Sequence, residues 1–120
     1  FVAVCKPDFP ISTPALFARV DGVMLSHRPD TDAMLAAIEH GDADTLCANV
    51  RNVFEQALEG EQRDCIEKIK HTLLQHGAKA AAMTGSGSVV FGLFSDETSC
   101  RAACDALQSG SIQAFCTEFV

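Results

Sequence analysis

The sequence is short of positive charge and has no long apolar run. It contains 9 Lys and Arg against 16 Asp and Glu, which gives a formal net charge of −7. Binding to a phosphate backbone needs clustered Lys and Arg that release counterions, so no nucleic-acid partner is expected. The longest apolar runs are only a few residues, too short to span a membrane. No basic stretch followed by an apolar one starts at Phe1, so we expect no signal peptide and a cytoplasmic location.

The chain also lacks any Cys-x-x-Cys pair, although it has 6 cysteines. Cys100 and Cys104 share one face of a predicted helix, but no His or second Cys pair stands at ligand spacing nearby. We therefore expect structural thiols in a reducing compartment and no metal site, while the spacing of this pair alone leaves metal binding open. No arrangement of Ser, His and Asp or of Cys and His indicates a nucleophilic site.

What is present fits one globular domain over residues 1–120, with 48% hydrophobic and 21% charged residues. Apolar periodicity and turn residues predict strands at about 2–6, 78–83, 89–94 and 112–120, and helices at about 14–20, 31–40, 43–59, 62–76 and 96–109. This order predicts an α+β fold: a ferredoxin-like split βαβ sandwich, with a four-stranded antiparallel sheet and helices on one face. A strand that starts at residue 1 indicates a fragment of a longer protein.

Helix ends and inward faces follow from particular residues. Thr13 is expected to cap the first helix, with Pro14 as its first residue. Gly60 is expected to end the helix at 43–59, which carries the clearest apolar spacing. The helix at 62–76 is expected to face inward with Ile66, Ile69, Leu73 and Leu74.

A glycine-rich loop, Thr84-Gly85-Ser86-Gly87-Ser88, joins two predicted strands. Because glycine has no Cβ, such a backbone can approach a phosphate closely. The loop lacks the Lys of a P-loop and opens no helix. An ordinary hairpin connection has the same appearance, so both interpretations stay open at this point.

The segment from Ile11 to Phe17 is the second candidate. It places a threonine, a proline and an aromatic ring around the start of a helix. Taken singly, Thr13 is explained as a helix cap and Phe17 as a core residue.

Three stretches together resemble the 4-diphosphocytidyl-2-C-methyl-D-erythritol kinase family of the GHMP kinase superfamily. The similarity extends over nearly the whole chain, with these stretches in the family's order and spacing. The stretches are Lys6-Pro7 with Ile11-Ser12-Thr13 and Phe17, then Asn52-Val53-Phe54-Glu55, and finally Gly77-Ala78 with Met83 to Leu93. The last stretch is shared more loosely across the superfamily, whose C-terminal halves are ferredoxin-like.

The resemblance implies an enzyme that phosphorylates the 2-hydroxyl of its substrate with ATP and Mg²⁺. The family's catalytic Lys and Asp and its main ATP loop lie in an N-terminal half that this sequence does not contain, so no catalytic residue is assigned here. By resemblance, Thr84, Gly85, Ser86 and Gly87 lie beside the ATP-phosphate loop. Thr13, Pro14 and Phe17 form the cytidine-side wall, with the aromatic ring against the cytosine.

The remaining features of the resemblance concern structure and partners. Asn52 and Glu55 match a pattern whose role we expect to be structural. Ser88 stands where a proline is common in relatives, which puts the stiffness of the loop in doubt. The expected partners are a small-molecule substrate and the chain's own N-terminal kinase half. Two alternatives stay open: a free-standing ferredoxin-like module that binds a small ligand, and the C-terminal half of another GHMP small-molecule kinase.

Overall fold

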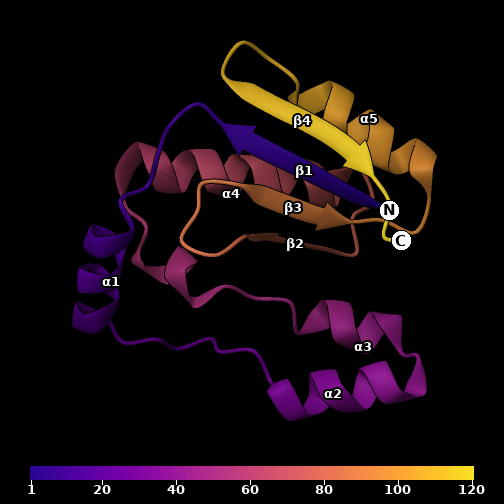
Figure 1. Ribbon diagram of the computed structural model, residues 1–120, viewed down its shortest axis with the longest axis horizontal. Coiled ribbons are helices and arrows are strands. Elements are labelled where there is room, and N and C mark those ends of the chain that lie inside the picture. The colour runs from indigo at the N-terminus through magenta and orange to yellow at the C-terminus, as the bar shows by residue number, and fades with distance from the viewer.

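The four strands form one antiparallel sheet in the order β2-β3-β1-β4 in the computed structural model, which describes residues 1–120 (Figure 1). The strands are β1 (Val2–Pro7), β2 (Ala80–Met83), β3 (Val90–Leu93) and β4 (Ile112–Thr117). The first and last strands are neighbours, and the β2–β3 hairpin lies on the other side of β1. This is the strand order of two interleaved βαβ units, so the α+β, ferredoxin-like prediction is confirmed.

Two helices cover one face of this sheet, and the others lie beside it (Figure 1). The helices are α1 (Thr13–Gly22), α2 (Thr31–His40), α3 (Ala43–Ala48), α4 (Gly60–Gln75) and α5 (Glu97–Leu107), with a 3₁₀ helix η1 (Val53–Ala57). α4 and α5 pack on the sheet, α1 packs on η1, and α2 packs on α3. No helix is both long and apolar enough to cross a membrane.

The core lies between the sheet and the two covering helices. α4 contributes Ile66, Ile69 and Leu73, all fully buried. α5 contributes Cys100, Ala103, Cys104 and Leu107. A Cβ at Gly92 of β3 would lie only 3.2 Å from the Leu73 side chain, so this position favours glycine. The sheet therefore approaches α4 closely at this point.

Leu74 does not face this core, contrary to the prediction for the helix at 62–76, because it is 48% exposed. Its neighbours at i−1, i−5 and i−8 form the buried stripe, and one further residue along a helix turns the side chain by about 100°. The stripe therefore ends at Leu73.

The helix predicted at 43–59 is wrong. α3 ends at Ala48, and a short irregular segment separates it from η1. Asn49 and Asn52 bound that segment: the Asn49 side chain donates to the carbonyl of Thr45, and Asn52 is extended, with φ −123° and ψ 114°. Asparagine side chains favour such local bonds over helix continuation. Gly60 does not end this helix either; it begins α4, with φ +57°.

The cap of α1 is also one residue earlier than predicted. The Ser12 side chain accepts a hydrogen bond from the Ala15 N–H at 3.4 Å, so Ser12 is the N-cap and Thr13 is the first helical residue. The Thr13 hydroxyl is consequently available for another partner. Several other ends differ by one to three residues; for example, α5 stops at Leu107 and β4 at Thr117.

All six cysteines are free, and three of them, Cys5, Cys100 and Cys104, are buried. No group of three or more His, Cys, Asp or Glu side chains lies close enough together to hold a metal ion. Burial and the nearby Cys104 raise the pKa of the Cys5 thiol to about 12. Burial is also the main cause that raises the pKa of Cys104.

From the raised pKa values of these thiols we expect the fold to lose stability at alkaline pH. A thiol whose pKa is raised on folding stabilises the fold below its unfolded pKa, about 8.5, and loses that contribution as the pH rises toward the folded value. We expect the urea midpoint of the reduced chain to fall between about pH 8 and pH 11, and to fall less steeply in Cys5→Ala. Equal slopes for the two proteins would contradict the assignment to Cys5.

Candidate functional site

The glycine-rich loop forms a tight hairpin between β2 and β3. The Thr84 N–H donates to the Val89 carbonyl at 2.8 Å, and the Gly87 N–H donates to the Thr84 carbonyl at 3.0 Å. Gly85 has φ +54° and Gly87 has φ +90°, in the region that favours glycine. Thr84 and Gly85 are exposed, so the tip of the loop is open to a ligand.

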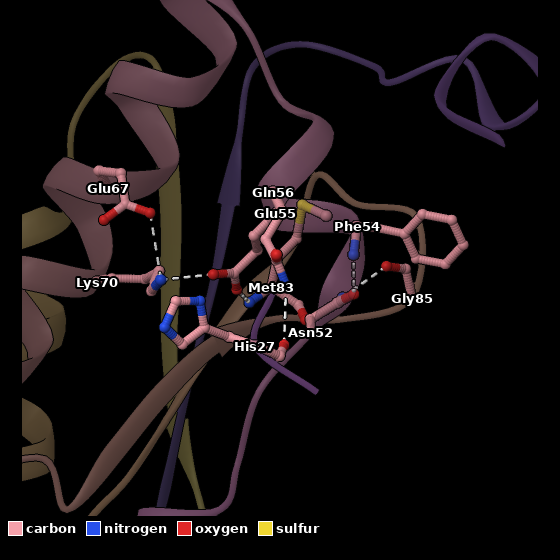
Figure 2. A network of polar contacts seen from close by, with 9 residues as sticks. All are labelled: His27, Asn52, Phe54, Glu55, Gln56, Glu67, Lys70, Met83 and Gly85. Carbon is pink, nitrogen blue, oxygen red and sulfur yellow. Dashed lines mark hydrogen bonds and ion pairs between the residues drawn. The ribbon is translucent and has the colours of Figure 1, made fainter. Parts of the chain in front are cut away.

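Asn52 holds the loop from the side of η1 (Figure 2). Its Nδ2 donates to the carbonyl oxygens of Met83 and Gly85, each at 2.7 Å. Its Oδ1 accepts from the Phe54 N–H at 3.0 Å. One side chain thus connects the base of the loop, the loop itself and the first turn of η1.

Glu55 binds the backbone N–H of Met83, the residue whose carbonyl oxygen is bound by Asn52. Its Oε1 accepts from the Met83 N–H at 2.6 Å, and its Oε2 accepts from Lys70 Nζ at 2.5 Å. Burial alone would lower the pKa of Lys70, but the hydrogen bond and charge of Glu55, with help from Glu67, raise it. Lys70 therefore stays charged and paired. Asn52 and Glu55 together satisfy both backbone groups of Met83 at this sheet edge.

The loop is held on its other side by the segment that leads into α1 and by the first residue of that helix. Ser88 is buried, and its hydroxyl donates to the Phe9 carbonyl at 2.7 Å. The hydroxyls of Thr13 and Ser86 lie 2.8 Å apart and form a hydrogen bond. Ser88 therefore fastens the loop to a neighbouring segment through a hydrogen bond, where relatives are expected to have a stiff proline.

Phe17 is not a core residue. Its side chain is 52% exposed, whereas the preceding Leu16 is fully buried. The Phe17 ring lies 4.9 Å from that of Phe54, with an interplanar angle of 77°, in an edge-to-face arrangement. Thr13 and Phe17 are one helical turn apart, so they lie on the same side of α1. Pro14 is exposed at the same helix start.

The structure thus brings the two predicted sites together. Thr13 contacts the loop through Ser86, and Phe17 reaches the same region through Phe54. A cavity of about 390 Å³ lies beside the loop, with Asn52, Phe54, Thr84 and Gly85 in its lining; Thr13, Pro14 and Phe17 do not line it.

Sequence reasoning missed Phe54 and Gln56 as parts of this region. Gln56 Nε2 donates to the His27 carbonyl at 2.8 Å, and Gln56 Oε1 accepts from the Ser26 N–H at 3.0 Å. These bonds fasten the segment between α1 and α2 to η1. The run from Asn52 to Gln56 has polar residues at both ends, a pattern that also fits a helix, so no local signal marked these contacts.

Comparison with protein families identifies the family of this domain. A family model described as GHMP kinases C terminal matches residues 34–112. The chain belongs to this family of C-terminal domains, as the motifs predicted.

Two curated relatives within this family share one name. The chain is 35% identical over 107 residues to a 4-diphosphocytidyl-2-C-methyl-D-erythritol kinase of Caldicellulosiruptor saccharolyticus, covering 89% of this chain and 37% of the relative. It is 32% identical over 118 residues to the enzyme of the same name from Pediococcus pentosaceus, covering 98% of this chain and 39% of the relative. The chain therefore spans well under half the length of these relatives.

Solved structures agree on the fold. A crystal structure of 4-(cytidine 5′-diphospho)-2C-methyl-D-erythritol kinase matches with a TM-score of 0.68 at 22% identity, over 95% of this chain and 41% of that one. Homoserine kinase from Cytophaga hutchinsonii matches with a TM-score of 0.70 at 14% identity, over 95% of this chain and 40% of that one. At these identities the similarity concerns the fold.

Proposed function

We propose that this chain is the C-terminal, substrate-side part of a kinase that transfers a phosphoryl group from ATP to the 2-hydroxyl of 4-diphosphocytidyl-2-C-methyl-D-erythritol. The names of the curated relatives support the substrate class. The observation that carries the proposal is the 2.8 Å hydrogen bond between Thr13 and Ser86. It joins the segment proposed for the cytidine to the loop proposed for the phosphates, so the two proposed subsites lie next to each other.

Phosphoryl transfer depends mainly on positioning and on stabilising charge. In this proposal Phe17, backed by Phe54, presents an aromatic edge and face to the cytosine. The loop residues Thr84 to Gly87 offer small side chains and backbone close to the phosphates. ATP supplies the phosphoryl group and Mg²⁺ neutralises its charge.

The groups that act directly on ATP are proposed to lie elsewhere in the longer protein. The loop contains no carboxylate that would bind Mg²⁺. The nearest ammonium of the network, that of Lys70, is paired with Glu55 and Glu67. We therefore assign no catalytic residue within residues 1–120 and place the main ATP and Mg²⁺ contacts in the preceding half.

A direct comparison of the two lengths of protein tests this proposal. The purified 120-residue chain should show no turnover of 4-diphosphocytidyl-2-C-methyl-D-erythritol above a blank, because it lacks the groups that orient the triphosphate. The longer protein should turn the substrate over with ATP. Turnover by the pure short chain would contradict the assignment of catalysis to the other half.

The same assay separates the alternatives. Phosphorylation of homoserine or mevalonate in place of the cytidine substrate would favour another GHMP small-molecule kinase. Saturable binding of the cytidine substrate by the longer protein, without any turnover, would favour a ligand-binding module.

A further inference from the structure

The side-chain amide of Asn52 makes three hydrogen bonds, two as donor and one as acceptor. Both donated bonds go to carbonyl oxygens on either side of Thr84, and the carbonyl oxygen of the amide accepts from the Phe54 N–H. Figure 2 shows Asn52 between Gly85 and Phe54, with Glu55 turned toward Lys70. Asn52 is part-buried, so these bonds are only partly replaced by water when they break.

Through its bond to the Phe54 N–H, Asn52 is connected to the aromatic pair of Phe17 and Phe54, the subsite proposed for the cytidine. The Phe54 ring supports the exposed ring of Phe17 at 4.9 Å. The backbone of Phe54 is placed by Asn52, so the orientation of the aromatic pair and the path of the glycine-rich loop depend on the same amide group. Glu55 bonds to Met83 and to Lys70, and it has no such connection to the loop tip.

We propose that Asn52 is a positioning residue that couples the glycine-rich loop to the Phe17–Phe54 pair, so that ordering one of them favours the ordered form of the other. This coupling rests on the proposed function only for what the two parts bind. It makes two chemical demands. The side chain at this position must donate twice and accept once, and it must be short. Aspartate lacks the donors, and glutamine has an extra methylene.

The test compares Asn52→Asp with Asn49→Asp. Asn49 is the matched control because it also donates a side-chain bond to one backbone carbonyl, that of Thr45, but touches neither subsite. Amide hydrogen exchange and Phe ring chemical shifts are measured by NMR on the 120-residue chain. KM and kcat for both substrates are measured on the longer kinase.

Asn52→Asp should speed exchange of the Thr84 and Gly87 amides by about tenfold, as expected for the loss of one or two hydrogen bonds. It should also move the Phe17 ring resonances, because the supporting ring shifts. In the longer kinase, KM should rise for ATP and for the cytidine substrate together, with a smaller change in kcat. Asn49→Asp should leave all of these near wild type.

The coupling is contradicted if folded Asn52→Asp changes the loop amides but leaves Phe17 unchanged, or if only one KM rises. The positioning role itself is contradicted if neither the amides nor the ring responds. Asn52→Ala, which adds no carboxylate against the two carbonyl oxygens, replaces Asn52→Asp if the latter does not fold. A longer protein without kinase activity would contradict the proposed function, while the exchange and ring shifts would still decide the positioning role.

Discussion

Gly87→Val should destabilise the chain by about 2–5 kcal/mol and remove most kinase activity from the longer protein. Gly87 has φ +90°, which valine adopts only under strain. A Cβ at this position would also lie 2.6 Å from Ile11 Cδ1 and 2.7 Å from Met83 Sδ. Both neighbours would have to move, and they flank the loop and the segment that precedes α1. The measurements are the urea midpoint of the 120-residue chain and turnover by the longer kinase.

Gly85→Val is the matched control for this prediction. Gly85 has φ +54°, and no atom lies within 4 Å of the position where its Cβ would be. Valine there carries the cost of the left-handed conformation, about 1–2 kcal/mol, without a clash. Gly85→Val should therefore stay folded and lose activity only through the shape of the loop tip. Equal stability loss in the two variants would show that packing against Ile11 and Met83 is unimportant.

The sequence predicted those parts of the fold whose signals are local. The strand at the start of the chain, the helix face that carries Cys100 and Cys104, and the turn through the glycine-rich loop each depend on residues close together in the chain, and the structure confirms them. The order of these elements was enough to predict the sheet topology. The resemblance then identified the family, which the matching family model confirms.

The contacts that assemble the candidate site were not predictable in this way. Asn52 bonds to the loop across 31 and 33 residues of sequence, and Thr13 bonds to Ser86 across 73. The local sequence around each of these residues gives no indication of its bonding partner. The apolar spacing over 43–59 also fits two short helical segments that both turn apolar residues inward, so periodicity alone could not find the break at which Asn52 lies.

The difference between Leu16 and Phe17 illustrates the same limit and sets up the last prediction. Both are apolar and adjacent in one helix, yet Leu16 is fully buried and Phe17 is 52% exposed. Residue type alone favours the larger aromatic as the core residue. In the structure Leu16 is the core residue, and the Phe17 ring packs on Phe54 with about half of its surface exposed to solvent.

Phe17→Ala should raise KM for the cytidine substrate of the longer kinase several-fold to about a hundredfold, with KM for ATP little changed. In the proposed site, the lost aromatic pairing with the cytosine contributes about 0.5–1.5 kcal/mol, and the lost apolar contact adds to it. Folding stability should fall only modestly, since the ring is half exposed and packs edge-to-face on Phe54 at the surface. The measurements are both KM values and the melting midpoint.

Leu16→Ala is the neighbouring control, and it should give the opposite result. Truncating this fully buried side chain should cost about 2–5 kcal/mol of folding stability and leave the KM values of the surviving folded enzyme near wild type. The two variants differ by one position on one helix, so a general loosening of α1 would affect both alike. An unchanged cytidine-substrate KM in folded Phe17→Ala would remove Phe17 from the substrate site and leave its ring with only the contact to Phe54.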